Sequence, residues 1–392
     1  MRSLGTVVRG VRAPIIRKGD DLVTITFESV KKAVEENNIT LHDKDVVAVT
    51  EAIVGKAQGN FATIDQIATD VKSKFDGEVV GLINPILSRN RFSLLLKGIA
   101  KGVKKLVIQL SYPTDEVGNP FMSFDDLDKA NVNPYSDSFT EEEFRKIFKD
   151  IKHPFTGLDY IEYYRSISDN IEIVLSNDPR NILKYTDQVI CGDIHTRFRS
   201  KRLLLSSGAK KVCGLDEILT SSVDGSGYNE KYGLLGSNLS DDTTVKLFPR
   251  DCQSFVDALQ QKFIEYYHVN VECMIYGDGA FKDPVGGIWE LADPVVSPAY
   301  TKGLEGTPNE IKLKYIADTT LKDVNGEEAV NKMKEFIKAK DDDLKAKNVS
   351  LGTTPRRITD LLGSLCDLTS GSGDKGTPII LIQGYFDNLA SE

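Results

Sequence analysis

The sequence has no long apolar run, no signal-peptide core and no excess of positive charge, and each absence excludes a class of protein. No segment approaches the roughly eighteen apolar residues that a membrane-spanning helix needs, and the N-terminus lacks the apolar core of a secretory signal. Lys and Arg number 49 against 58 Asp and Glu, giving a net charge of −9. This balance argues against a general affinity for nucleic acid or for an anionic membrane.

The sequence also lacks paired cysteine motifs and nucleotide-binding signatures. The five cysteines are scattered without a C-x-x-C pair, which indicates free thiols in a reducing cytoplasm rather than a zinc site. No G-x-x-x-x-G-K-[ST] sequence is present. Residues 371–376 match G-x-G-x-x-G but precede a predicted strand, the reverse of the order that a dinucleotide site requires. We therefore expect a cytoplasmic protein without a dinucleotide fold.

Apolar periodicity predicts an α/β protein of mixed α and β content, and 392 residues allow two or three domains. Some segments have the pattern of buried strands: 7–17, 45–49, 78–84, 105–111, 171–175, 188–192, 212–215, 245–249, 273–276 and 379–384. Others have helical spacing: 27–36, 63–75, 93–101, 141–150, 201–207, 251–268 and 358–368.

The stretch Asp43–Asn60 carries the first candidate site. Its strand continues as an apolar run into Gly55 and Lys56, with Gly59 three residues further on. A lysine between two glycines at the end of an apolar strand lets the backbone approach a phosphate and the cation neutralise it. A strand end with a lysine that extends into solvent explains the same pattern.

Three further polar groups allow two interpretations each. Asp20 and Asp21 suit either the cap of the following helix or a binding turn. Residues 88–91 cluster polar and cationic groups between a strand and a helix, where anions dock, but a solvated helix start has the same composition. Asp193 and His195 follow a strand and suit an acid/base pair or an anion contact, although no partner motif accompanies them.

Asp278 is the strongest single candidate in the chain. It follows the buried strand 273–276 and lies between Gly277 and Gly279. A carboxylate at a strand end with open backbone around it is a usual position for a Mg²⁺ ligand. A turn is the simpler alternative. In the same stretch, Lys282 could neutralise phosphate.

Five segments taken together resemble the coenzyme F420-0:γ-glutamyl ligase family. Residues 15–22 are similar to its I-K-x-G-D-D-L segment, and residues 45–60 to its D-V-x-V-V-x-x-x-I-x-x-K-A-x-G run, with Asn60 where archaeal members tend to have arginine. Residues 234–242 resemble N-A-G-I-D-x-S-N, residues 273–287 its metal-binding strand end, and residues 371–378 its G-E-G-G-D-G-I-P loop.

The resemblance implies an amide-forming ligase that uses GTP as co-substrate, Mg²⁺ or Mn²⁺ and a monovalent cation such as K⁺, and that acts as a homodimer on small-molecule substrates. It implies catalytic roles for Asp278 and Lys56, and metal binding by Asp278, Asn238 and Asp241. The nucleotide contacts that it implies are Pro14, Ile15, Ile16, Arg17, Gly55, Lys56, Asn60, Asp241, Gly371, Ser372, Gly373, Asp374, Lys375 and Gly376.

The sequence departs from the family pattern at two metal positions. Asn238 and Asp241 exchange the family's Asp and Asn, and Ser372 replaces a glutamate. An Asn carbonyl coordinates Mg²⁺ without bringing charge, so we expect weaker metal binding unless Asp241 or Asp242 compensates. Residues 1–82 and 233–392 are the predicted ligase-like core, and 83–232 a divergent inserted or rebuilt substrate region. A same-family ligase with another acceptor, or a nucleotide-binding protein without catalysis, are the alternatives.

Overall fold

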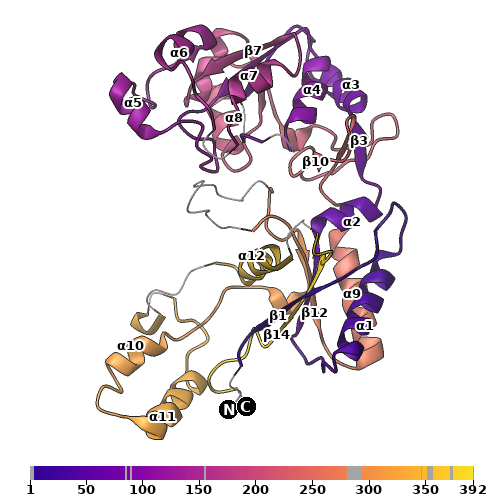
Figure 1. The fold of residues 1–392 in the computed structure, drawn as a ribbon, viewed down its shortest axis with the longest axis vertical. Coiled ribbons are helices and arrows are strands. Elements are labelled where there is room, and N and C mark those ends of the chain that lie inside the picture. Colours follow the sequence, from indigo (N-terminus) through magenta and orange to yellow (C-terminus); the bar gives the residue numbers. More distant parts are fainter. Residues whose placement is uncertain are drawn as a thin grey trace.

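The computed structural model describes residues 4–83, 86–88, 91–153, 156–279, 293–345, 347–350, 356–370 and 374–391. The chain forms two lobes, each built around a sheet, with the two termini close together at the far end of the lower lobe (Figure 1). Alternating strands and helices place the fold in the predicted α/β class, which is confirmed.

The described strands are β1 (Val7–Val11), β2 (Val46–Thr50), β3 (Phe61–Thr63), β4 (Val79–Ile83), β5 (Lys105–Leu110), β6 (Phe139–Thr140), β7 (Ile171–Leu175), β8 (Gln188–Cys191), β9 (Lys211–Gly214), β10 (Asn238–Leu239), β11 (Thr244–Lys246), β12 (Glu272–Tyr276), β13 (Ala299–Tyr300) and β14 (Ile379–Gln383). The described helices are α1 (Leu22–Glu36), α2 (Glu51–Ala57), α3 (Ile64–Lys74), α4 (Ser93–Lys101), α5 (Phe124–Ala130), α6 (Glu141–Ile147), α7 (Tyr160–Arg165), α8 (Arg197–Ser206), α9 (Cys252–Tyr267), α10 (Leu313–Asp318), α11 (Gly326–Lys338) and α12 (Ile358–Ser370), with short 3₁₀ turns at Pro179–Lys184, Leu215–Glu217, Lys302–Leu304 and Asn348–Ser350.

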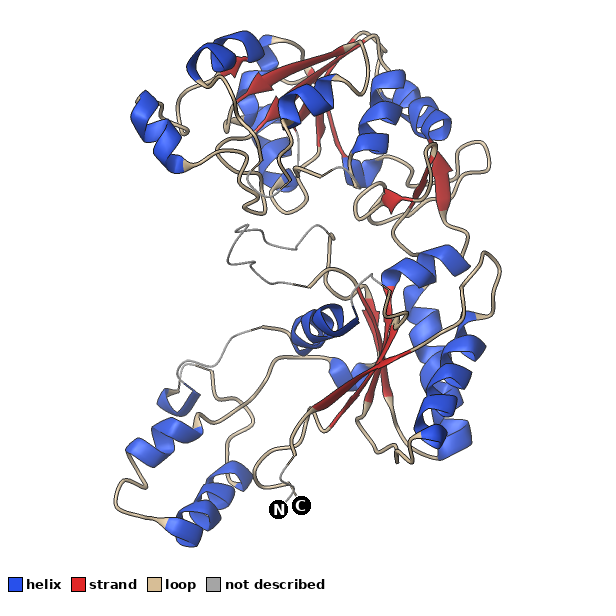
Figure 2. Ribbon diagram, viewed as in Figure 1, coloured by secondary structure: helices blue, strands red, loops and turns tan. Residues whose placement is uncertain are grey.

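The lower lobe is a five-stranded sheet with the order β1-β14-β2-β12-β13, covered on both faces. Side chains of β2 alternate between the faces, since Val47 and Val49 pack with α1 and α9 while Val46 and Ala48 pack with α12. Figure 2 shows α1 and α9 on one side of this sheet and α12 on the other. Because both faces are buried, the central strands are apolar throughout, as the sequence pattern predicts.

The upper lobe is a six-stranded sheet with the order β6-β7-β5-β4-β8-β9, parallel except at β6. Helices α3 and α4 pack against one face through Ile67 and Ile99, and α8 packs against the other face through Leu204. The units β4-α4-β5 and β8-α8-β9 are crossover connections of the kind that parallel sheets require.

A small three-stranded sheet, β10-β11-β3, belongs to the upper lobe and lies nearest the lower one (Figure 1). Strands β3 and β4 therefore lie in the upper lobe, although residues 61–82 fall within the predicted core. Residues 238–246 also lie there. The structural lobes thus divide the chain near residues 60 and 250, while the functional division into a ligase core and a substrate region stays a prediction.

The structure corrects one predicted element and shortens or lengthens others. The run after β2 does not continue as a strand, because Thr50 ends β2 and Glu51–Ala57 form helix α2. Helix α1 begins at Leu22, five residues earlier than predicted, with Asp21 as its cap: one carboxylate oxygen accepts the Thr24 N–H at 3.1 Å. Strand β1 ends at Val11 rather than at Arg17.

Other elements match their predicted positions. Helix α4 and strand β7 have the predicted bounds, and Thr63 caps α3 in a reciprocal capping box with Gln66. Within the described residues, no helix has the length and apolarity to cross a membrane. All five cysteines are free thiols, and four of them are buried.

Candidate active site

A cavity of about 990 Å³ opens between the two lobes. The lower lobe contributes Pro14, Ile15, Ile16, Lys56 and Asp278, together with Gly376 and the segment that follows it. The upper lobe contributes Ser88, Arg91 and Asn238. The structure thus brings together predicted residues from all five family-like segments of the sequence.

Lys56 reaches this cavity from a helix rather than from a strand end. Gly55 belongs to α2 and is required by packing, since a Cβ there would lie 3.0 Å from the carbonyl oxygen of Leu247. Gly59 has a φ of +63°, and a Cβ added there would lie 2.6 Å from a side-chain carbon of Lys18. The two glycines therefore serve close packing and a helix-ending turn, and Lys56 alone of the three faces the cavity. Its ammonium forms no hydrogen bond or ion pair with another described residue.

Several predicted nucleotide contacts lie elsewhere. Asn60 is buried and holds two turns together, donating to the Phe248 carbonyl and accepting from the Tyr228 N–H, both at 2.9 Å. Arg17 is exposed and does not line the cavity, and its backbone N–H donates to Asp20 at 2.7 Å.

The predicted loop contacts are only partly described. Asp241 is exposed and accepts the Thr243 N–H at 2.9 Å, which is ordinary turn chemistry. Lys375 donates to the Thr369 carbonyl at 3.4 Å, and neither it nor Asp374 lines the cavity. Residues Gly371, Ser372 and Gly373, together with Lys282, lie outside the described residues.

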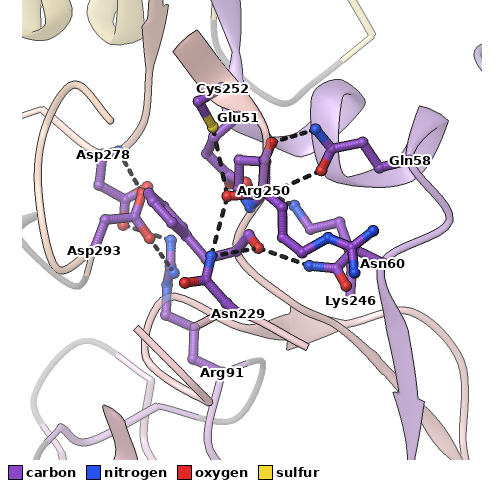
Figure 3. A network of polar contacts seen from close by, with 12 residues as sticks. Glu51, Gln58, Asn60, Arg91, Asn229, Lys246, Arg250, Cys252, Asp278 and Asp293 are labelled. Carbon is purple, nitrogen blue, oxygen red and sulfur yellow. Dashed lines mark hydrogen bonds and ion pairs between the residues drawn. The ribbon is translucent and has the colours of Figure 1, made fainter. Parts of the chain in front are cut away.

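Asp278 forms an ion pair that links the lobes. Its Oδ2 accepts from Nη2 of Arg91 at 2.5 Å, while Nη1 of Arg91 donates to Oδ1 of Asp293 at 2.8 Å. Asp293 in turn accepts the Asp278 N–H at 2.8 Å, so the two carboxylates and the guanidinium form one network (Figure 3). Arg91 therefore binds two carboxylates of its own chain, a role that neither sequence interpretation gave it. Arg89 and Asn90 of the same predicted cluster lie outside the described residues.

The upper lobe positions Arg91 through the segment before α4. The Leu87 N–H donates to Asp115 at 2.8 Å, the Ser88 N–H donates to the Tyr164 hydroxyl at 2.9 Å, and the Arg91 N–H donates to the Ser88 hydroxyl at 3.2 Å. Burial alone would lower the pKa of Arg91, but the carboxylates of Asp293 and Asp278 outweigh it and raise that pKa. The guanidinium stays charged throughout the accessible pH range.

A second buried ion pair lies beside the first. Glu51, the first residue of α2, accepts from the Lys246 ammonium at 3.0 Å, and both side chains are at most 10% exposed. Burial raises the pKa of Glu51, and the Lys246 charge opposes that rise. Lys246 comes from β11 in the upper lobe, so two cation–carboxylate pairs connect the lobes at the cavity (Figure 3).

The acidic groups have the donor chemistry of a magnesium or manganese site but not its arrangement. Glu51, Asp278 and Asp367 line the cavity, and carboxylate oxygens are the preferred ligands of these ions. Arg91 and Lys246, however, hold two of these three carboxylates, and Asp367 accepts the Gly279 N–H at 3.0 Å. Among the described residues, no group of three or more His, Cys, Asp or Glu side chains is placed to bind a metal. For Asp278 to ligate a metal through Oδ2, Arg91 would have to release that oxygen.

Sequence reasoning missed the partners of Asp278. Asp293 gave no signal, because a single Asp before a proline is common turn chemistry. Glu51 follows a buried strand and could have been singled out by the argument applied to Asp278. His195 is exposed, and Asp193 lines a different cavity in the upper lobe.

A family model described as F420-0:Gamma-glutamyl ligase matches residues 10–384. The chain belongs to the F420-0:gamma-glutamyl ligase family. The match runs through residues 83–232, so the part that we predicted to be divergent lies inside the family match. A search of curated proteins finds no match to this chain.

Membership of this ligase family agrees with the composition of the cavity. Residues from the five family-like segments meet there, namely Ile15, Lys56, Asn238, Asp278 and Gly376. The family description indicates a ligase that acts broadly in γ-glutamyl transfer to F420-0.

Proposed function

We propose that the protein is a GTP-dependent γ-glutamyl ligase that forms an amide between L-glutamate and a carboxylate acceptor resembling F420-0. The observation that carries the proposal is the cavity between the lobes. Lys56 and Asp278, from the two best family-like segments, both line this cavity, and the family match covers residues 10–384.

The proposed reaction has two displacements. A carboxylate oxygen of the acceptor attacks the γ-phosphorus of GTP, the bond to the bridging β–γ oxygen breaks, and GDP leaves. The glutamate amine then attacks the acyl carbon of the acyl phosphate, the C–O bond to phosphate breaks, and the amine gives up a proton. Both steps need positive charge near the transferring phosphoryl group.

Lys56 is the cation that we propose to meet the phosphates. It is exposed to the cavity, and no described carboxylate neutralises it, so its full charge is available to an incoming anion. Arg91 contributes differently, because its two ion pairs fix the distance between the lobes and hold Asp278 in place.

Mg²⁺ or Mn²⁺ is part of the proposal because a triphosphate substrate carries more charge than one lysine offsets. Asp278 is its proposed ligand, together with Asn238, which lines the same cavity, and the ion would supply further charge neutralisation when bound. Binding would require Arg91 to give up one carboxylate. The other family expectations, a cytoplasmic homodimer and a monovalent cation such as K⁺, are kept as parts of the same proposal.

The test measures GDP and glutamylated product with F420-0, L-glutamate and GTP or ATP, each with Mg²⁺ or Mn²⁺. We expect product formation with GTP, and Lys56→Ala should raise the KM for GTP at least tenfold, equivalent to about 1.4 kcal/mol. Lys32→Ala is the matched control, because Lys32 is an exposed lysine on α1 away from the cavity.

Three other outcomes have separate meanings. Nucleotide binding without product from F420-0, but with product from another carboxylate, would favour the same-family ligase with a different acceptor. Nucleotide binding without turnover of any acceptor would favour a protein that has lost catalysis. Failure to bind any nucleotide would overturn the proposal.

A further inference from the structure

Arg91 holds its two carboxylates in unequal surroundings. The Asp293 side chain is 1% exposed, and both of its oxygens are engaged: Oδ1 accepts from Nη1 of Arg91 at 2.8 Å, and Oδ2 accepts the Asp278 N–H at 2.8 Å. The Asp278 side chain is 21% exposed, and of the two carboxylates it alone lines the cavity between the lobes. A cation that enters this cavity therefore reaches Asp278 and competes with Arg91 for its Oδ2 (Figure 3).

A displaced Arg91 would stay at the cavity. Its backbone N–H donates to the Ser88 hydroxyl at 3.2 Å, and the Ser88 N–H donates to the Tyr164 hydroxyl at 2.9 Å. Its Nη1 stays on the buried Asp293 when Nη2 leaves Asp278. The guanidinium would then lie next to the incoming dication. Even at the dielectric constant of water, repulsion between these charges at contact distance corresponds to about tenfold or more in affinity.

A displaced Nη2 also needs a new hydrogen-bond acceptor. The Arg91 side chain is only 19% exposed, and a charged donor left without a partner in such a place is costly. The other carboxylates that line the cavity are already engaged. Glu51 accepts from Lys246 at 3.0 Å. Asp367 accepts the Gly279 N–H at 3.0 Å. A phosphate oxygen suits Nη2, because hydrogen bonds between guanidinium and phosphate are charge-assisted.

We propose that Arg91 keeps divalent cations out of the empty cavity, and that it releases Oδ2 of Asp278 only when a nucleoside triphosphate brings both the metal and a phosphate oxygen for Nη2. The inference rests on the proposed function, from which it takes the nucleotide and the metal. It adds a second contact for Arg91 and an order of binding, in which the metal enters with the nucleotide and not before it.

The first measurement is Mn²⁺ binding to the full-length protein without nucleotide, followed by electron paramagnetic resonance of the free ion. Arg91→Met removes the competing charge, so we expect it to bind Mn²⁺ at least tenfold more tightly than the wild type. Adding Asp278→Asn to Arg91→Met should abolish this gain. Arg145→Met is the matched control, because Arg145 donates to Asp159 at the same two distances, 2.5 and 2.8 Å, within the upper lobe.

The second measurement is isothermal titration with a non-hydrolysable GTP analogue in excess Mn²⁺. Here Arg91→Met should bind the analogue at least tenfold more weakly than the wild type, because the phosphates lose their contact with Nη2. The two effects of this substitution have opposite signs, whereas a purely structural role of Arg91 would weaken both kinds of binding. Arg91→Lys should show smaller changes in the same directions, and circular dichroism checks that every variant folds.

Three results would overturn the inference. The first is a Mn²⁺ affinity of Arg91→Met that equals or falls below that of the wild type. The second is an equal gain of Mn²⁺ affinity in Arg145→Met, and the third is an analogue affinity that Arg91→Met leaves unchanged. Neither readout involves the acceptor or glutamate, so absence of product from F420-0 would contradict the ligase proposal alone. Product formation by a wild type that binds free Mn²⁺ as tightly as Arg91→Met would contradict this inference alone.

Discussion

Replacing Arg91 by methionine should loosen the contact between the lobes. Arg91 makes two charge-assisted hydrogen bonds, at 2.5 Å to Asp278 and 2.8 Å to Asp293, and the Asp293 side chain is only 1% exposed. Removing one partner of a buried ion pair costs about 3–5 kcal/mol, because the remaining charges lose their compensation. We expect this change to lower the free energy needed to open the contact between the lobes, and to leave the stability of the upper-lobe core unchanged.

Hydrogen exchange followed by mass spectrometry measures that opening locally. A loss of about 3 kcal/mol corresponds to more than a hundredfold increase in the opening equilibrium, since each 1.4 kcal/mol is a factor of ten. We therefore expect exchange to rise about a hundredfold or more at Gly277–Gly279. Arg91→Lys should show a smaller rise, because a lysine cannot donate in parallel to two carboxylates.

Arg145→Met is the matched control. Arg145 makes two hydrogen bonds of the same lengths, 2.5 and 2.8 Å, but to Asp159 within the upper lobe. Its replacement should leave exchange at residues 277–279 unchanged. If residues 277–279 of Arg91→Met exchange at the same rate as in the wild type, the assigned role of Arg91 is refuted.

Three further predictions concern buried charges. Burial raises the pKa of Asp193 from 3.8 to about 6, so the native state holds this proton more tightly and stability falls as pH rises from about 4 to 6. In urea titrations, the free energy of unfolding of Asp193→Asn should therefore exceed that of the wild type by up to about 3 kcal/mol at pH 7.5 and should equal it near pH 4. A difference between the two proteins that does not change with pH would contradict this. Lys246→Met leaves Glu51 unpaired, so it should lower the free energy of unfolding by about 3–5 kcal/mol. The double variant that also carries Glu51→Gln should recover most of this loss in the same titrations. Gly277→Ala places a Cβ against Oδ2 of Asp293, so exchange at residues 277–279 should rise as in Arg91→Met, and an unchanged rate would be inconsistent with this packing.

Local patterns were sufficient to predict most of the fold. Capping residues such as Thr63 and apolar periodicity act within one turn or strand, so α3, α4 and β7 could be read from neighbouring residues alone. Helix α2 was missed because its apolar run is short, and periodicity cannot distinguish a short buried helix from a strand.

The candidate site could be predicted only in part. Lys56 and Asp278 stood out because each follows a buried strand and has glycines nearby, and both line the inter-lobe cavity. The partner of Asp278 could not be inferred, since Arg91 is 187 positions away and the pair exists only once the two lobes meet. Asn60, which the family resemblance implies as a nucleotide contact, holds two turns together in the structure. A buried amide and a binding amide have the same sequence signal, so the sequence alone does not separate these roles.

The most direct test of the central claim follows oxygen-18 from the acceptor carboxylate. If the acceptor attacks the γ-phosphorus of GTP and glutamate then displaces phosphate, the inorganic phosphate released with each glutamylated product should carry one oxygen-18 atom. We predict this transfer with F420-0 as acceptor. In Lys56→Ala, the rates of labelled phosphate release and of product formation should fall together at GTP concentrations near the wild-type KM. Glutamylated product accompanied by unlabelled phosphate would contradict the acyl-phosphate route, and GTP hydrolysis without product would contradict the ligase assignment.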